Sequence, residues 1–348
     1  MRRISLQMGD ALFVSKLSYL LCYDREERSV LMDLSYLLWL QELRTGMGGA
    51  LDGLFEQISY FVISPYMFAL LGVVCWCVSA KGGAWMFMNV SVADFVNNVV
   101  KLTACIYRPW VRDPRIVPAG DAITTATGYS FPSGHSTLAT AEFGSLAVWQ
   151  RRRKWAVVLC CIAVALVLFS RNYLGVHTPQ DVVVGCGLCS VVIFCNSRVW
   201  RWLEGGANRD WIAVGAALAA GVLAMAYIVL KPYPLDYTEA GTLLVDPVKM
   251  QPDAFAGVGR MWGFWLGFAL HRHFLPEEVG GGLPVRVVRA VAGVAGLLVI
   301  NLVKHPLNAL VGALAGPLVW NFLLFFYIIF LYPLIFNAVE RRLKSNVK

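Results

Sequence analysis

Long apolar stretches recur along most of this chain, and they constrain its fold more than any other feature. Each is roughly 20 residues long, the length of helix that crosses about 30 Å of hydrocarbon. Hydrophobic residues make up 58% of the chain, charged residues only 15%, and the mean hydropathy is +0.60, which excludes an ordinary soluble domain. The sequence therefore predicts an all-α, polytopic membrane helical bundle with about nine transmembrane helices. We expect these helices near residues 58–80, 84–107, 133–150, 155–174, 179–198, 211–230, 254–271, 288–303 and 310–338.

The placement of basic residues predicts the orientation of the bundle. The formal net charge is +8, and Lys and Arg gather at 151–154, 198–209, 271–289 and 341–348. Following the predicted helices in order puts all four clusters on one side, which the positive-inside rule makes cytoplasmic. The loops 108–132, 175–178 and 231–253 then lie on the extracytoplasmic side. An odd number of crossings leaves the N-terminus outside despite Arg2 and Arg3, a conflict that an N-terminal segment lying on the bilayer would remove.

The chain divides into three predicted parts. Residues 1–54 form an N-terminal segment without a visible cleavable signal peptide, in which 29–42 reads as an amphipathic helix at the membrane interface. Residues 55–205 form a helical core, and 206–348 form a C-terminal transmembrane extension. Most of the nine cysteines lie inside apolar helices, where a free thiol packs as a small hydrophobe. We expect neither a disulfide framework nor a metal site, even at the Cys186-x-x-Cys189 pair.

Three short polar runs stand out from the apolar background, and the first is Lys101 with Arg108-Pro109. Seven residues correspond to two helical turns, so the two cations are expected on one face of one helix. Pro109 would end that helix. Considered alone, the pair could equally snorkel to the headgroups from a helix end.

The second run is Pro132-Ser133-Gly134-His135, which reads as a helix start. Free N–H groups at a helix N-terminus make an anion site, and Gly134 would let a phosphate oxygen approach the backbone. Ser133 could add its hydroxyl, and His135 could give a proton to a leaving oxygen. Taken alone, the run is also an ordinary helix start with an interfacial histidine.

The third run is Ser170-Arg171 followed by His177 and Asp181. Thr178 would cap the next helix, and Asp181 could bond one imidazole nitrogen so that the other attacks phosphorus. The competing account makes Asp181 only the acidic member of a capping box with Thr178. One carboxylate could serve both purposes.

In this order and spacing the three runs resemble the signature of the type 2 phosphatidic acid phosphatase superfamily, with every position filled. The resemblance covers roughly residues 55–200. It implies a phosphate pocket made by Lys101, Arg108, Ser133, Gly134 and Arg171, with His177 as nucleophile, Asp181 orienting it and His135 as general acid. The signature also resembles that of soluble vanadium haloperoxidases, which the hydrophobicity of this chain argues against.

The resemblance and the residues agree on a metal-independent lipid phosphatase that works through a phosphohistidine, with no cofactor and no nucleic-acid partner. The expected substrates are polyprenyl pyrophosphate, phosphatidate-type lipids, sphingoid phosphates or lipid A, and the expected location is a bacterial inner or plasma membrane with the site facing outward. Two alternatives are a lipid phosphotransferase and a non-catalytic lipid-phosphate carrier. The oligomeric state is not predicted.

Several charged residues lie outside the signature. Glu142 follows His135 by seven residues inside an apolar span, where it could buffer His135 or bond a neighbouring helix. Arg112, Asp113 and Arg115 could contact a headgroup, but such loop residues more often face solvent. The extension after residue 205 could shape a path for a lipid chain or form an oligomer interface.

Overall fold

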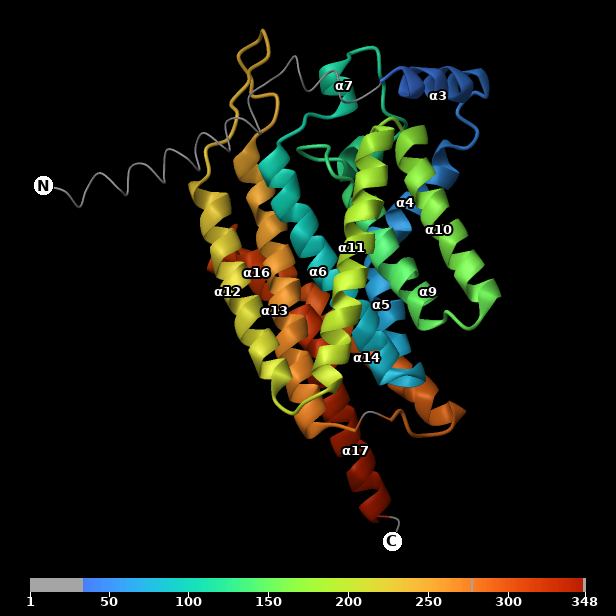
Figure 1. Ribbon diagram of the computed structural model, residues 1–348, viewed down its shortest axis with the longest axis vertical. Coiled ribbons are helices and arrows are strands. Elements are labelled where there is room, and N and C mark those ends of the chain that lie inside the picture. The colour runs from blue at the N-terminus through green and yellow to red at the C-terminus, as the bar shows by residue number, and fades with distance from the viewer. Residues whose placement is uncertain (1–33, 277, 347–348) are drawn as a thin grey trace, which may run out of the picture.

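The computed structural model describes residues 34–276 and 278–346. In this part of the chain the regular structure is helical, apart from a β-bridge between Tyr237 and Leu243. Most helices run along the long axis of an elongated bundle (Figure 1). The prediction of an all-α fold is confirmed. The expectations for the first 33 residues, including their orientation, lie outside the described residues.

The described helices range in length from the 4 residues of α7 to the 26 residues of α11. In chain order they are α3 (Ser35–Gly46), α4 (Asp52–Ile63), α5 (Pro65–Val73), α6 (Ala80–Ala104), α7 (Pro109–Arg112), α8 (Gly134–Ala139), α9 (Ser145–Trp149), α10 (Lys154–Tyr173), α11 (Pro179–Glu204), α12 (Arg209–Leu230), α13 (Gln251–Phe274), α14 (Leu283–Leu302), α15 (Lys304–Val311), α16 (Ala315–Phe326) and α17 (Tyr332–Asn346). Short π or 3-10 turns join or interrupt them: η1 (Val74–Val78), η2 (Ala122–Thr125), η3 (Thr140–Gly144), η4 (Pro247–Met250) and η5 (Tyr327–Leu331).

Each apolar segment predicted from the sequence contains one of these helices or a run of them. Within the described residues, five helices are long and apolar enough to cross a membrane, and the α4–α5 pair, bent by 54°, makes a sixth if it is one span. Helix α6 falls outside this set although it has 25 residues, because polar side chains such as Asn89 and Asp94 interrupt its apolar surface. The chain is an integral membrane protein, while the number nine stays a prediction.

Helix α6 ends earlier than its sequence suggests. Its last residue is Ala104, and Cys105 takes a left-handed conformation with φ 51°. Arg108 is extended, as expected for a residue before a proline, and Pro109 begins α7. The prediction that Lys101 and Arg108 share one face of one helix is therefore wrong. The two cations still lie at the same end of the bundle, because Arg108 follows shortly after the last residue of α6.

One end of the bundle collects the three polar runs. Helices α6 and α10 finish there and α8 and α11 begin there, beneath α3, α7 and the long loop before α13 (Figure 1). The loops that join α9 to α10, α11 to α12 and α13 to α14 lie toward the opposite end (Figure 1). These loops and the helix ends beside them carry the basic clusters at 151–154, 198–209 and 271–289, so these three clusters and the polar runs are separated as predicted.

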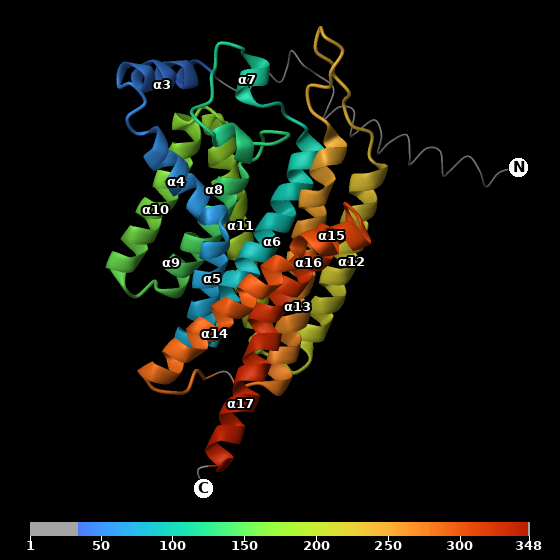
Figure 2. The same ribbon diagram turned by 180° about the vertical axis from the view of Figure 1, so that it is seen from behind.

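The helices of the C-terminal extension pack directly against the helices of the core. Figure 2 shows α14 rising along the back of the bundle to α15, which crosses it before α16 and α17 return. Gly259 and Gly263 on α13 face α16 so closely that a side chain at either position would collide with the backbone of Leu318 or Phe322. Buried aromatic side chains fill the shared core, with Phe87 from α6 and Phe325 from α16 in T-shaped contact. The boundary near residue 205 stays a prediction.

Candidate active site

Arg108 ties together the loops at this end of the bundle. Its guanidinium is buried and donates to the carbonyl oxygens of Thr127, Gly128 and Val176, at 3.0, 3.2 and 3.0 Å. Its Nη1 also lies 2.9 Å from Nε2 of His177. Burial lowers the pKa of Arg108 from 12.5 to about 10, and the nearby Asp181 carboxylate partly offsets this shift. Arg108 therefore remains a cation at neutral pH.

Lys101 lies on the last turns of α6 and is buried beneath the second run. Its Nζ donates to the carbonyl oxygens of Pro132, Ser130 and Tyr129, at 2.6, 3.2 and 3.3 Å. An ammonium group has three hydrogens, so these carbonyls occupy its donors. Lys101 fastens the loop before α8 and contributes a positive charge to the site.

Arg171, at the end of α10, is the cation with donors to spare. It is only 1% exposed, and its Nη1 donates to the hydroxyl of Ser59 on α4. Among the described residues, its Nε and Nη2 are buried without an acceptor. Unpaired buried guanidinium donors are costly, which is the signature of a site that awaits an anion.

The second run forms the predicted helix start. Ser133 is the N-cap of α8, and its hydroxyl accepts from the amide of Ser136 and from its hydroxyl. The helix continues through η3 and α9, so its positive end points at the site. A Cβ built on Gly134 would meet no closer protein atom than Asn97 Oδ1 at 3.7 Å. The packing of the protein therefore leaves open space against this backbone.

His135 follows Gly134 and faces the cations. Its side chain is buried, and its Nε2 has no hydrogen-bond partner among the described residues. It lies within electrostatic reach of Arg171 and His177 as well as Arg108 and Lys101. The structure thus brings the general-acid candidate and the nucleophile candidate within electrostatic reach of each other, although they are far apart in sequence.

The third run pairs His177 with Asp181 at the start of α11. His177 Nδ1 lies 3.3 Å from Asp181 Oδ2, and both side chains are almost completely buried. The same Oδ2 accepts the Thr178 amide at 2.8 Å, while the Thr178 hydroxyl accepts the Asp181 amide. The capping-box account and the orienting account are therefore both satisfied by one oxygen.

Two side chains that complete the site were missed from the sequence. Ser130 donates to Asp181 Oδ2 at 2.6 Å and lies 3.4 Å from His177 Nδ1, and Asn172 donates to the His177 carbonyl at 2.9 Å. Both lie within three residues of a motif position, and this proximity is the signal in the sequence that could have identified them. Together they hold the ring and its carboxylate in place.

The tautomer of His177 follows from its neighbours. Arg108 can only donate, so Nε2 must present a lone pair, and Nδ1 carries the hydrogen that it donates to Asp181. Burial, and then the charge of Arg108, hold the pKa of His177 well below its ordinary value, which keeps the ring neutral. At their ordinary pKa values, Lys101 and the two arginines against the one carboxylate would give the site a net charge of about +2, which suits a phosphate dianion.

The outlying charged residues separate into two groups. Asp113 and Arg115 pair with each other at 2.7 Å in the exposed loop, which favours the solvent-facing interpretation for these two. Glu142 is 1% exposed on η3, and neither carboxyl oxygen has a partner among the described residues. It bonds no neighbouring helix there. Among the described residues, no group of three or more His, Cys, Asp or Glu side chains is placed to hold a metal ion.

The fold and site define a class of protein, a polytopic helical membrane protein with a buried, cation-lined anion site and a histidine poised beside it. The model of the PAP2 superfamily matches residues 82–204. The model of the transmembrane extension of PAP2 superfamily phosphatases matches residues 255–345. The chain therefore contains a PAP2 superfamily domain, of the superfamily that its polar runs resemble, followed by a PAP2 transmembrane extension.

Curated relatives are similar over parts of the chain. Lipid phosphate phosphatase delta of Arabidopsis thaliana is 24% identical over 221 residues, which are 60% of this chain and 50% of that protein. Undecaprenyl-diphosphatase of Sulfolobus acidocaldarius is 37% identical over 73 residues, 21% of this chain and 34% of that protein. Phosphatidylglycerophosphatase B of Escherichia coli K12 is 43% identical over 80 residues, 22% and 30% of the two chains. The chain thus spans half or less of the length of these relatives.

A solved structure is also similar, the crystal structure of a PAP2-type phosphatidylglycerolphosphate phosphatase from Bacillus subtilis. It aligns with a TM-score of 0.41 and 20% identity, over 56% of this chain and 96% of that chain.

Proposed function

We propose that this protein is an integral membrane phosphatase that hydrolyses a lipid mono- or diphosphate, without a metal, through a phosphohistidine at His177. The observation that carries the proposal is the pair of contacts on that ring. Nδ1 faces Asp181 and Nε2 faces Arg108, so the ring is neutral and oriented, with its lone pair directed among cations. An oriented lone pair at a cationic site is what nucleophilic attack on a phosphoryl group requires.

In the first step His177 Nε2 attacks phosphorus, forming a P–N bond as the P–O bond to the lipid breaks. His135 gives its proton to the leaving oxygen. In the second step water attacks the phosphohistidine, and His135 takes a proton from that water. Inorganic phosphate leaves and both histidines return to their starting states, so the cycle balances without an added reactant.

The cations hold the phosphoryl oxygens during both steps. Arg171 supplies the free Nε and Nη2 donors, and the first turn of α8 supplies backbone N–H groups at Gly134 and His135 that the helix leaves without acceptors. Arg108 and Lys101, already bonded to carbonyls, act through their charge. This division supports the proposal that substrate binding depends most on Arg171 and the Gly134 backbone.

A lipid substrate is supported by the position of the site and by the relatives. The candidate site lies at one end of helices that are long and apolar enough to cross a membrane, and the relatives named above are lipid or polyprenyl phosphatases. We propose phosphatidylglycerophosphate-type, undecaprenyl and lipid A phosphates as substrates. The basic clusters at the other end favour a site on the extracytoplasmic face of a bacterial plasma membrane.

The test is phosphate release from a small lipid panel by purified protein in EDTA. His177→Ala is expected to abolish release, and wild-type protein mixed with labelled substrate and quenched rapidly should carry an acid-labile phosphoryl group. Release by His177→Ala at the wild-type rate would exclude the assigned nucleophile. Stoichiometric binding without turnover would favour a carrier, and a labelled lipid product in place of inorganic phosphate would favour a phosphotransferase.

A further inference from the structure

A cavity lies at the end of the bundle opposite the candidate active site. It opens between η1, α6, α11, α13 and η5. Its lining includes Lys81 on the first turn of α6 and Glu204 on the last turn of α11, so the cavity lies at the end of the bundle where α6 begins and α11 ends. The first-turn residue Asp181 and the last-turn residue Glu204 are separated by most of α11, which is 26 residues long, so the candidate active site and this cavity are about 35 Å apart along the helix.

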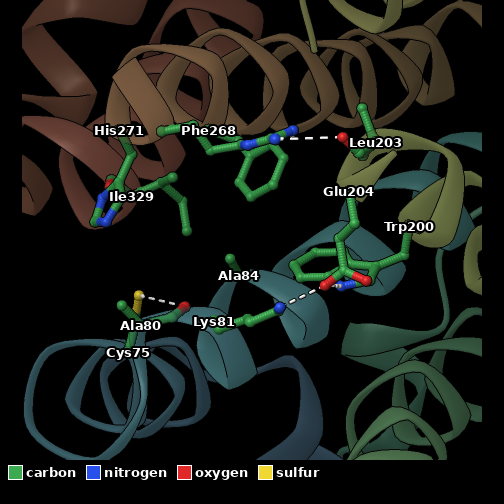
Figure 3. A pocket seen from close by; sticks show the side chains of 11 residues that line it. Cys75, Ala80, Lys81, Ala84, Trp200, Leu203, Glu204, Phe268, His271 and Ile329 are labelled. Atoms are coloured by element: carbon green, nitrogen blue, oxygen red, sulfur yellow. Dashed lines mark hydrogen bonds and ion pairs between the residues drawn. The ribbon is translucent and has the colours of Figure 1, made fainter. Parts of the chain in front are cut away.

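Charged groups line one part of this cavity and apolar groups the other. Figure 3 shows Lys81 directed at Glu204 on one side, with His271 and Phe268 across the space. The Trp200 indole donates to Glu204 Oε1 at 3.1 Å. Ala84, Leu203, Phe268 and Ile329 supply the apolar wall.

Arg272 has a buried hydrogen-bond donor for which the described residues provide no acceptor. Its Nη2 donates to the Leu203 carbonyl at 3.3 Å, but among the described residues Nη1 is buried without an acceptor. Among the described residues Arg272 forms no ion pair, and Glu204, which lies near enough to feel its charge, pairs with Lys81. Lys81 and Glu204 cancel, so Arg272 leaves the cavity with a net charge of about +1.

His271 lies beside Arg272 on α13. Its Nδ1 lies 2.8 Å from the Ile329 carbonyl oxygen, which can only accept, so Nδ1 carries a hydrogen. A monoanion matches the single charge of Arg272. A phosphodiester carries one negative charge at neutral pH, whereas the dianion that suits the active site would leave this cavity overcharged.

We propose that this cavity binds the phosphodiester of an anionic membrane lipid, such as phosphatidylglycerol, with Arg272 as its main ligand. The phosphate would accept from Arg272 Nη1 at the rim of the bundle, where headgroups lie, and the apolar wall would cover the first carbons of an acyl chain. The surrounding basic residues at 198–209 and 271–289 concentrate anionic lipids at this end. The apolar wall favours a lipid over a soluble phosphodiester.

Native mass spectrometry of the full chain, with added phosphatidylglycerol or phosphatidylcholine, tests this site. Arg272→Gln should weaken retention of phosphatidylglycerol about tenfold, as expected for the loss of one charge-assisted hydrogen bond, and leave phosphatidylcholine unchanged. Arg201→Gln is the matched control, because it removes the same charge from an exposed position near the end of α11. It should retain phosphatidylglycerol like the wild type.

Two more variants keep the result interpretable. Ala84→Leu fills the cavity without changing its charge and should lower retention as Arg272→Gln does, and His177→Ala should retain the lipid fully because the active site is at the other end. Arg272→Gln should still release phosphate, which shows that it is folded. Equal retention by Arg272→Gln and Arg201→Gln would overturn the proposal. Competition by glycerophosphoglycerol at lipid-like concentration would overturn the lipid assignment in favour of a soluble ligand.

Discussion

Ser130 Oγ donates a hydrogen bond to Asp181 Oδ2 at 2.6 Å, and the same carboxylate oxygen accepts from His177 Nδ1. The serine lies in the loop that Lys101 fastens, whereas the aspartate lies on α11. The contact therefore joins the second and third polar runs directly. It sets where the carboxylate stands, and the carboxylate sets the direction of the imidazole.

Ser130→Ala is expected to lower kcat about tenfold while KM changes little, because the hydroxyl positions Asp181 and touches no substrate. Ser130→Thr retains a hydroxyl and should recover much of the loss. Steady-state phosphate release measures both constants. A rise in KM at unchanged kcat would show that the hydroxyl binds the substrate instead.

Asp181→Asn and Thr178→Ala together separate orientation from helix capping. Asp181→Asn should reduce kcat at least about 100-fold, because an amide no longer enforces the tautomer with Nε2 free. Thr178→Ala removes the other half of the capping box and should cost about 1 kcal/mol of stability with a small effect on kcat. Thermal unfolding and turnover are measured on the same preparations. Equal losses of turnover would leave Asp181 with a structural role only.

Gly134→Ala tests whether the open space at the start of α8 serves the substrate. The protein can accommodate the added Cβ, whose nearest neighbour would be 3.7 Å away, so the melting temperature should hold. The methyl group would occupy space left for a phosphoryl oxygen, and kcat/KM should fall at least about tenfold. Gly187→Ala, at an open position on α11, is the control and should match the wild type in both measurements. Unchanged kcat/KM in Gly134→Ala would contradict the proposed phosphate position.

The lowered pKa of His177 predicts a specific pH dependence. The folded ring stays neutral below about pH 6.5, where the unfolded ring takes up a proton, so stability declines as the pH falls from about 6.5 toward the lowered pKa. Between pH 7.5 and pH 5.5 the wild type should lose more of its melting temperature than His177→Gln, which has no ring to titrate. Parallel losses would mean that the pKa of His177 is not lowered.

The ion pair between Asp94 and Arg260 predicts that core and extension unfold together. Arg260 donates to Asp94 Oδ2 from Nε and Nη2, at 3.0 and 2.9 Å, and to Asn321 on α16. Arg260→Gln leaves a carboxylate unpaired inside the bundle and should cost roughly 3 kcal/mol, and the Asp94→Asn partner change should recover part of it. A double-mutant cycle on thermal unfolding measures the coupling. Additive losses would show that the pair is uncoupled.

Much of the site was predictable because its chemistry resides in compact runs with fixed spacing. Local rules correctly predicted a helix start at the run 132–135, although Ser133 is the N-cap of α8 and not its first residue, and they correctly placed Thr178 as the cap of α11. They failed at Cys105, whose left-handed conformation ends α6 early, because nothing in its residue type requires that conformation. Ser130, Asn172 and Ser59 acquire their roles only through contacts between segments far apart in sequence. Such contacts depend on tertiary packing, which the hydrophobic periodicity of the sequence does not predict.

The two glycines of α13 that admit the backbone of α16 have a consequence for how this chain can be shortened. A fragment that stopped near residue 205 would keep every polar run of the active site, yet it would lose Arg260 and leave Asp94 stranded in hydrocarbon. The later helices are thus built into the electrostatics of the earlier ones. Catalysis by the amino-terminal half on its own would require a replacement for the cation of Arg260 and for the helices that pack against the core.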